Sequence, residues 1–212
     1  MYKRELTAII IALFTLGVIS FSSTYLFYVV MTLVLLVAVY ELAPLIKNPF
    51  MPSVSILFLI CASVFLLPVY ESNRDIFLFV ISISVITDSA SYYFGKNIGC
   101  TKVFPKTSPN KTLEGLIFGS LFSLIILYLV CFYQFFDFNL IDSFENNIYL
   151  IPFLVLLILG AVFGDFLESK AKRHANIKDS GNLLPGHGGI LDRLDSQLLV
   201  LPLFFVIFHF IK

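Results

Sequence analysis

The sequence predicts an all-α integral membrane protein, a polytopic helical bundle with about seven transmembrane helices. Of its 212 residues, 58% are hydrophobic and only 13% are charged, and the mean hydropathy is +0.94. A soluble domain of this size carries about a quarter charged residues and needs a polar exterior. The composition therefore excludes a disordered chain, a disulfide scaffold and a free nucleic-acid-binding domain, so no nucleic-acid partner is expected.

Hydrophobic stretches follow one another along the chain, and a transmembrane helix needs about 20 apolar residues. The first stretch follows Lys3 and Arg4 and ends near Ser22, which also fits a secretory signal. Because further apolar stretches follow at once, we interpret it as a retained helix. The predicted spans are residues 6–22, 24–46, 50–70, 75–95, 114–136, 148–168 and 194–211.

The basic residues predict the orientation of these spans. With the N-terminus in the cytoplasm, only Arg74 and Lys212 of the fourteen Lys and Arg residues fall on the outer side. Cytoplasmic loops are enriched in Lys and Arg. We therefore expect a multi-pass protein of the cell (inner) membrane, with its N-terminus inside and its C-terminus outside.

The whole chain, residues 1–212, is expected to form one membrane domain, in which residues 1–84 supply N-terminal helices and residues 85–200 carry the functional groups. Two loops in the second part, residues 96–113 and 169–193, are long, polar and rich in Gly and Pro. The predicted orientation puts both in the cytoplasm. Since they hold most of the charged side chains, we expect the active site at the cytoplasmic face.

Carboxylates near the predicted helix ends suggest a divalent metal. Asp165 and Glu168 are three residues apart, as are Asp192 and Asp195, and Asp88 lies late in the fourth span. An ionised carboxylate at this depth costs several kcal/mol unless it is paired, hydrated or bound to a cation. Oxygen ligands favour Mg²⁺ or Mn²⁺ over zinc. Interfacial salt bridges with neighbouring Lys and Arg residues are the alternative interpretation.

The same loops mix cations with hydroxyl and amide groups, a combination that suits phosphate oxygens. Anchoring of helices and attraction of lipid head groups is the alternative. In residues 184–190, three glycines surround His187. They either bring backbone N–H groups close to an anion or only shape a tight loop, and His187 could donate to phosphate or act as acid or base. The cationic and polar candidates are Ser108, Asn110, Lys111, Lys172, Arg173, Lys178 and Arg193.

Two GxxxG pairs, Gly115/Gly119 and Gly160/Gly164, predict close helix packing, either within the chain or in a homodimer. Metal and phosphate groups at the membrane surface together predict phosphoryl or nucleotidyl transfer to or from a lipid. A transporter, with the carboxylates along an ion path, is an alternative from another class. The clustering of charges at one face argues against it.

The segment from Ser169 to Asp195 carries a dense motif. It fits the pattern S-x-[apolar]-K-R-x4-K-D-x-[small]-x2-[apolar]-P-x-H-G-G-[apolar]-x-D-R-[apolar]-D, except that Ala171 stands where a larger apolar residue is usual. This motif resembles the signature of the phosphatidate cytidylyltransferases, also called CDP-diacylglycerol synthases. Residues 88–96, 108–115 and 164–169 are similar to further motifs of that family, with Ser91 and Leu113 as departures.

The resemblance implies transfer of CMP from CTP to phosphatidate, giving CDP-diacylglycerol and pyrophosphate in phospholipid biosynthesis. CTP, phosphatidate, the membrane and Mg²⁺ are then the expected partners, with a second, monovalent cation left open. A CTP-dependent lipid-alcohol (polyprenol) kinase is the alternative enzyme. On this resemblance, the catalytic residues are Asp165, Asp192, Lys172, Arg173, Arg193 and His187; the substrate-binding residues are Ser108, Asn110, Lys111, Lys178, Gly188 and Gly189; and the metal ligands are Asp165, Asp192, Asp88 and Glu168.

Overall fold

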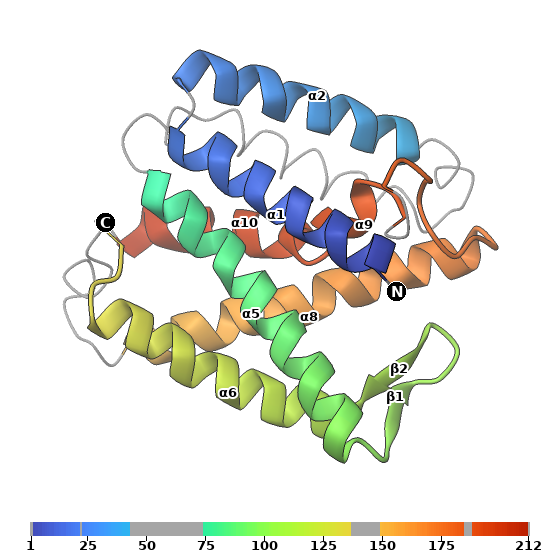
Figure 1. Cartoon of the computed structure of the whole chain (residues 1–212). Coiled ribbons are helices and arrows are strands. Elements are labelled where there is room, and N and C mark those ends of the chain that lie inside the picture. The colour runs from blue at the N-terminus through green and yellow to red at the C-terminus, as the bar shows by residue number, and fades with distance from the viewer. Residues whose placement is uncertain (1, 22, 43–73, 137–148, 185–187, 212) are drawn as a thin grey trace.

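The computed structural model describes residues 2–21, 23–42, 74–136, 149–184 and 188–211. Helices make up most of these residues, as the composition predicts, and α5 crosses α6 and α8 in the centre of the bundle (Figure 1). The helices are α1 (Tyr2–Phe21), α2 (Thr24–Leu42), α5 (Arg74–Ile98), α6 (Leu113–Phe132), α8 (Leu150–His174), the short α9 (Leu191–Leu194) and α10 (Gln197–Ile211).

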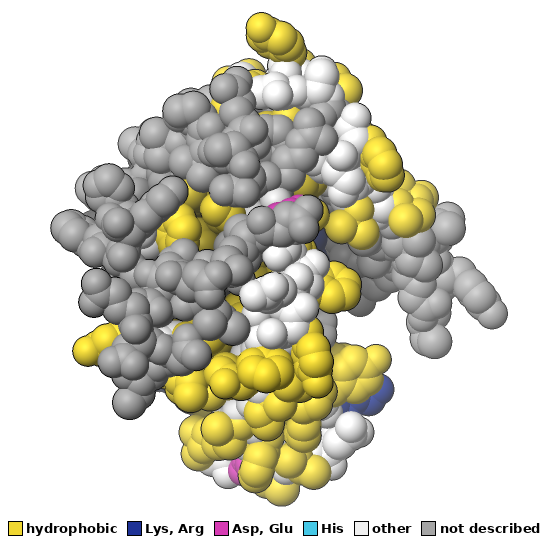
Figure 2. Space-filling view, turned by 90° about the vertical axis from the view of Figure 1, so that its left-hand side faces the viewer, with side chains coloured by type: hydrophobic (Ala, Val, Ile, Leu, Met, Phe, Trp, Pro, Cys, Tyr) yellow, Lys and Arg dark blue, Asp and Glu magenta, His cyan; other side chains and the backbone are white. Residues whose placement is uncertain are grey.

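Four of the described helical segments are long and apolar enough to cross a membrane. Helices α1 and α10 coincide with the first and last predicted spans, whereas the predicted span 50–70 lies outside the described residues. Hydrophobic side chains cover most of the described surface in Figure 2. The multi-pass membrane class is therefore supported, while the count of seven spans stays a prediction. The four segments are Thr24–Leu42, Asp75–Ile98, Leu113–Phe132 and Leu150–His174.

Large apolar side chains fill the interior between α5, α8 and α10. Phe79 of α5 and Phe204 of α10 are both fully buried, and their ring centroids lie 6.2 Å apart. Leu154 and Leu157 of α8 are also fully buried in this cluster. Lipid tails are as apolar as these side chains, so the contacts stabilise the bundle through close packing rather than by excluding water.

Both GxxxG pairs are used within the chain. A Cβ on Gly115 would lie 2.7 Å from the Cα of Gly95, and one on Gly119 would lie 2.5 Å from the Cα of Ser91. These glycines allow α6 to approach α5 closely. In the second pair, a Cβ on Gly164 would lie 2.7 Å from the carbonyl oxygen of Asp195. A homodimer would therefore need another surface.

A β-hairpin stands where the sequence predicts an irregular loop. Strands β1 (Lys102–Phe104) and β2 (Ser108–Thr112) pair antiparallel. The Thr107 N–H donates to the Phe104 carbonyl at 3.2 Å, which closes a turn over residues 104–107. Pro105 occupies the second position of this turn, where proline is favoured. The all-α prediction thus needs one correction, because this polar segment satisfies its backbone hydrogen bonds by pairing with itself.

Helix α8 extends beyond the predicted span, which ends at residue 168, as far as His174. Its last turn carries Lys172 and Arg173, whose positive charges suit the C-terminal end of a helix. Asn176, with φ 57°, then takes the left-handed conformation common just after a helix. The predicted loop 169–193 therefore begins with a rigid helical turn, which fixes the direction of both basic side chains.

Candidate active site

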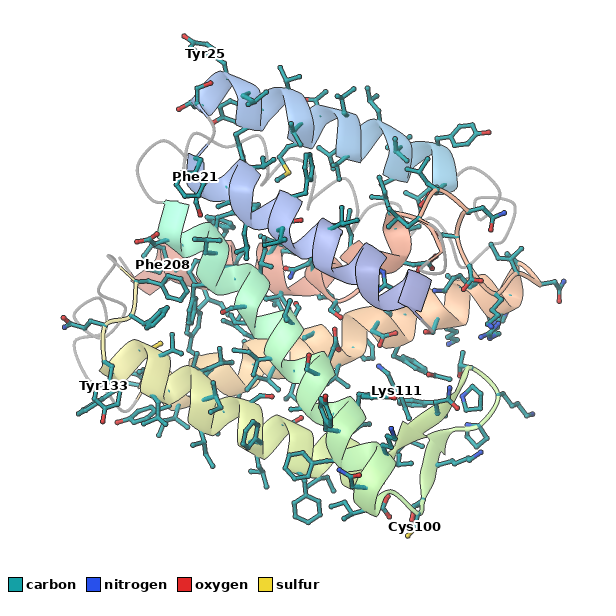
Figure 3. All side chains as sticks on the ribbon, viewed as in Figure 1. Phe21, Tyr25, Cys100, Lys111, Tyr133 and Phe208 are labelled. Carbon is teal, nitrogen blue, oxygen red and sulfur yellow. The ribbon has the colours of Figure 1, made fainter. Side chains whose placement is uncertain are left out.

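The predicted site residues gather at one end of the bundle. The hairpin, the C-terminal end of α8 and α9 lie toward this end (Figure 1). Lys111 points from β2 toward α8, while Tyr133 and Phe208 mark the opposite end (Figure 3). The hairpin is held there by Phe104, because the centroid of its ring lies 4.3 Å from the ring centroid of Phe166 on α8. Segments far apart in the sequence thus supply one polar region.

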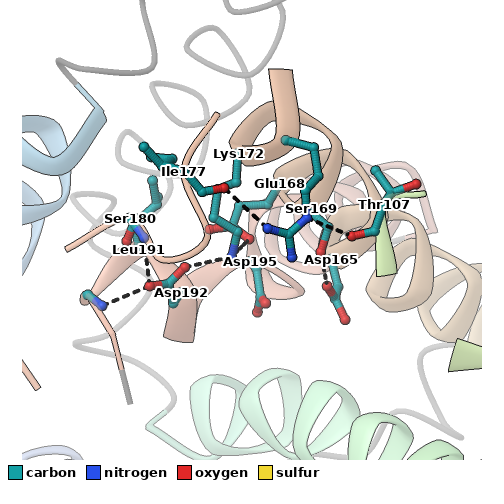
Figure 4. Close-up of polar contacts among 12 residues, drawn as sticks. Thr107, Asp165, Glu168, Ser169, Lys172, Ile177, Ser180, Leu191, Asp192 and Asp195 are labelled. Atoms are coloured by element: carbon teal, nitrogen blue, oxygen red, sulfur yellow. Dashed lines mark hydrogen bonds and ion pairs between the residues drawn. The ribbon is translucent and has the colours of Figure 1, made fainter. Parts of the chain in front are cut away.

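Lys172 lies at the centre of a buried charge network (Figure 4). Its Nζ lies 2.6 Å from Glu168 Oε2 and 2.6 Å from Asp192 Oδ1. Glu168 is 1% exposed and Asp192 is 7% exposed. Glu168 Oε1 has no hydrogen-bond partner among the described residues, and Oε2 contacts the ammonium without well-directed hydrogen-bond geometry. Lys172 therefore pairs with two buried carboxyl groups, and its predicted role in holding phosphate stays a prediction.

Asp192 is held on its other side by backbone groups of the loop before α9. Its Oδ2 accepts hydrogen bonds from the Ser180 N–H at 2.9 Å and from the Gly189 N–H at 2.8 Å. Burial opposes its ionisation, but the bonds from Lys172, Gly189 and Ser180 outweigh burial and lower the pKa of Asp192 below its ordinary value. Asp192 is thus an ionised anchor for this loop, and both of its oxygens are occupied.

A second group of carboxylates lies around Asp165. Its carboxylate pairs with Lys111 Nζ and accepts a hydrogen bond from Ser169 Oγ at 3.1 Å. Asp88 Oδ2 accepts a hydrogen bond from Ser196 Oγ at 2.7 Å, and the negative charges of Asp88 and Asp165 both act on Asp195. Three carboxylates from α5, α8 and the turn before α10 therefore share one neighbourhood.

The ligand atoms that this group of carboxylates offers are of the type that Mg²⁺ prefers. Asp88, Asp165 and Asp195 offer only oxygen atoms, which Mg²⁺ prefers, and their mutual repulsion is the condition that a divalent cation relieves. Within the described ranges, no three His, Cys, Asp or Glu side chains converge closely enough as they stand to hold a metal ion. These three could hold one; Asp192 and Glu168 lie in the Lys172 network, and their role as metal ligands stays a prediction.

Arg173 joins the hairpin to the end of α8. Its Nε donates to the Thr107 carbonyl oxygen at 3.1 Å, and its Nη1 donates to the Ile177 carbonyl oxygen at 3.3 Å (Figure 4). The side chain is exposed, but two of its donors are committed to backbone oxygens. This geometry favours a structural link between two loops over the predicted role in phosphate binding.

The remaining predicted residues line the surface of the same region. Lys178, Asn110 and Arg193 are exposed, and Ser108 is half-buried. Gly188, with φ +81°, takes a conformation that favours glycine. His187 lies outside the described residues, so its predicted role stays a prediction.

The structure adds three residues that the motif analysis missed. Ser180 and Ser196 hold Asp192 and Asp88 as described above. Glu41, on α2, is only 5% exposed and contacts the loop before α9. A lone carboxylate inside a predicted span is itself a signal of function, and that signal was present in residues 24–46.

A family model matches most of the chain. Residues 51–211 match the model of the cytidylyltransferase family. This chain belongs to the cytidylyltransferase family. The matched range includes the hairpin, α8, α9 and α10, and therefore every described residue of the site except Glu41. The family favours the predicted nucleotidyltransferase class over the lipid-alcohol kinase and the transporter.

Curated relatives carry a more specific name. The chain is 48% identical over 121 residues to a protein of Staphylococcus haemolyticus named phosphatidate cytidylyltransferase, over 56% of this chain and 43% of that protein. Proteins of the same name from Staphylococcus aureus (strain COL) and Bacillus subtilis (strain 168) are 45% and 44% identical, over 63% and 55% of this chain and 50% and 40% of theirs. The chain spans about half the length of the curated relatives it matches, or less.

Proposed function

We propose that this cytidylyltransferase-family protein transfers CMP from CTP to phosphatidate, forming CDP-diacylglycerol and pyrophosphate. The observation that carries the proposal is the name shared by relatives that are 44% to 48% identical to it. The site supports it, because cations and carboxylates gather where a lipid head group at the membrane surface could reach them. Acyl chains would stay in the bilayer while the phosphate enters the polar region.

The reaction needs no covalent enzyme intermediate, because the attacking group is already an anionic phosphate oxygen. This oxygen of phosphatidate attacks the α-phosphorus of CTP in line and forms a new P–O bond. The bond between the α-phosphorus and the oxygen bridging to the β-phosphate breaks, and pyrophosphate leaves with the electron pair. Mg²⁺, held by Asp88, Asp165 and Asp195, would neutralise charge on the phosphates when bound.

The chain's own cations have to overcome the repulsion between two anionic substrates. Lys111 is placed for this role, because its ammonium pairs with Asp165, one of the three proposed Mg²⁺ ligands. Lys178 is exposed and can turn toward phosphate oxygens, and we assign the exposed Arg193 to the same oxygens. We assign the backbone N–H of Gly188 and the side chain of His187 to the nucleotide phosphates, and Ser108 and Asn110 to substrate positioning.

The finer topology belongs to the same proposal: seven spans, a cytoplasmic N-terminus and a location in the cell (inner) membrane. Cys100 offers a direct test, because it is exposed at the base of the hairpin. In a variant that keeps Cys100 alone among the three cysteines, a membrane-impermeant maleimide should label inverted vesicles and spare right-side-out ones. Labelling of right-side-out vesicles alone would reverse the orientation. A second copy of the chain would be detected by cross-linking in the same vesicles.

The activity is tested with purified full chain in detergent–lipid micelles containing phosphatidate, α-³²P-labelled CTP and Mg²⁺. We expect label in the organic phase as CDP-diacylglycerol, and its loss when a chelator is added. Label that stays in the aqueous phase as CTP under all conditions would refute the proposed reaction.

A further inference from the structure

Glu41 lies near the C-terminal end of α2, before the residues that match the family model and far in sequence from the signature motif. We propose that Glu41 is a positioning residue that holds the described parts of the α8–α9 loop, residues 175–184 and 188–190, in the arrangement that the site requires. The inference deepens the proposed function and rests on it only where catalysis is measured.

Three donors from the loop and from α9 converge on the Glu41 carboxylate. Ser180 Oγ donates to Oε2 at 3.1 Å, the Ile190 N–H donates to Oε1 at 3.2 Å, and the Leu191 N–H donates to Oε2 at 2.9 Å. Glu41 is 5% exposed, so these bonds replace the water that a carboxylate otherwise needs. Charge-assisted bonds of this kind are the stronger ones in proteins.

These bonds complete the beginning of α9. The residue at its N-cap position is Ile190, which has no side-chain acceptor and makes no side-chain cap bond. The first N–H groups of a helix have no partner within the helix and need one from elsewhere. Glu41 supplies this hydrogen-bond acceptor from about 150 positions away in sequence. A residue of α2 thus caps α9, a role that a local Ser or Asp side chain usually has.

Two glycines of the signature motif make room for this carboxylate. A Cβ built on Gly181 or on Gly189 would overlap the Glu41 carboxylate oxygens. This contact gives a steric reason for a small residue at Gly181, two positions after Asp179, and for the second glycine of His187-Gly188-Gly189. A side chain at either position would push Glu41 away from the loop.

The loop is held between two carboxylates. Ser180 donates its hydroxyl to Glu41 and its backbone N–H to Asp192. Gly189 donates its N–H to Asp192, while the position of its missing Cβ faces Glu41. Loss of Glu41 should therefore also loosen the partners of Asp192. Ala38, Leu42 and Leu191 lie in one buried apolar cluster. This packing keeps α2 beside α9 and so places Glu41 next to the loop.

The structural part is tested by hydrogen exchange on the full chain in lipid nanodiscs, which needs no enzymatic activity. Glu41→Gln keeps the size of the side chain but places an NH₂ donor against a backbone N–H. We expect exchange at Ile190 and Leu191 to accelerate about tenfold, with α6 unchanged. Tyr40→Phe, one position away and 80% exposed, is the matched control and should exchange like the wild type. Unchanged exchange at Ile190 and Leu191 in Glu41→Gln would overturn the inference.

The functional part separates positioning from general destabilisation. For Glu41→Gln we expect KM for CTP to rise about tenfold, while kcat per folded enzyme changes less than about twofold. Phe27→Leu on the same helix should lower Tm without moving KM, since Phe27 is buried in the core far from the loop. An unchanged KM in folded Glu41→Gln would contradict positioning.

Ser180→Ala provides the second variant, which keeps the test decisive if Glu41→Gln does not fold. It removes one donor to Glu41, so by itself it should speed exchange at Ile190 and Leu191 and raise KM for CTP; neither change in folded Ser180→Ala would overturn the inference. When Glu41→Gln folds, the effect of the two changes together should be less than additive, because both break the same bond. A wild type that makes no CDP-diacylglycerol would refute the proposed function, and the exchange experiment would still decide the role of Glu41.

Discussion

Lys172 Nζ and Asp192 Oδ1 lie 2.6 Å apart and join α8 to α9. The same ammonium also lies 2.6 Å from Glu168 Oε2, so one cation is shared between two buried carboxyl groups. Removal of one partner from a buried ion pair leaves an uncompensated charge, which costs more than the pair itself contributes. The junction of α8 and α9 is therefore the part of the site that is most sensitive to a change of charge.

Lys172→Met should destabilise the folded protein by about 3–5 kcal/mol and abolish activity. Lys106→Met, on the exposed hairpin turn, is the control and should leave stability unchanged. The double variant Lys172→Met with Glu168→Gln should regain part of the lost stability, because it removes one of the two stranded charges. Denaturant unfolding in detergent measures all three. A double variant as unstable as the single one would contradict this network.

The acid stability of the protein should depend on Asp192. Burial opposes ionisation of Asp192, but hydrogen bonds from Lys172, Gly189 and Ser180 outweigh it and hold the pKa of the folded-state carboxyl below its ordinary value. The stabilisation is therefore complete above the unfolded pKa and is lost as the pH falls through the lower, folded pKa. Asp192→Asn removes the ionisable carboxyl, so the Tm of this variant should fall less steeply than that of the wild type below about pH 4. Parallel Tm curves would exclude the proposed pKa shift.

Asp165 and Asp195 should control the response to Mg²⁺. Asp165→Asn and Asp195→Asn each remove one carboxylate of the proposed ligand group (Asp88, Asp165 and Asp195), so activity should fall by about ten- to a hundredfold. The Mg²⁺ concentration for half-maximal activity should rise in both. Asp75→Asn is the control, because Asp75 lies at the opposite end of α5. It should leave the Mg²⁺ requirement unchanged, which would show that the loss of any carboxylate charge is not enough. If the Mg²⁺ requirement of both site variants matched that of the wild type, the ligand assignment would be wrong.

Sequence patterns predicted the helices and the general place of the site because these depend on local composition. Long apolar runs predicted α5, α6 and α8, although α8 continues six residues past residue 168. The three-residue spacing put Asp165 and Glu168 on one helix face. What it could not decide was the partner of each charge. Asp192 pairs with Lys172 and Asp165 with Lys111, so four charged residues divide into two groups.

The features that sequence reasoning missed depend on contacts between distant segments. Glu41 meets Leu191 only because α2 packs beside α9 in the fold. The hairpin was also missed, since the five residues of β2, Ser-Pro-Asn-Lys-Thr, lack the alternation of apolar and polar residues typical of a strand. Its position depends on the contact between the rings of Phe104 and Phe166. No local pattern carries that information.

Gly119 should be essential for the packing of α6 on α5. A Cβ at this position would lie 2.5 Å from the Cα of Ser91, and backbone cannot yield as a flexible side chain can. Gly119→Ala should therefore destabilise the chain by about 1–3 kcal/mol. Gly17→Ala is the matched control, because nothing lies within 4 Å of the added methyl. Equal unfolding midpoints for the two variants would contradict this packing.

Arg173 should act by holding the hairpin rather than by binding a substrate. Its guanidinium donates to the carbonyl oxygens of Thr107 and Ile177, and the short ammonium of Arg173→Lys cannot reproduce both bonds. We expect faster hydrogen exchange in residues 102–112 and an activity loss of about tenfold. Lys178→Arg, nearby and exposed, keeps the charge and should preserve the hairpin. Because a phosphate-binding arginine would lose affinity for CTP without loosening the hairpin, an unchanged exchange rate combined with a raised KM would instead assign Arg173 to the substrate.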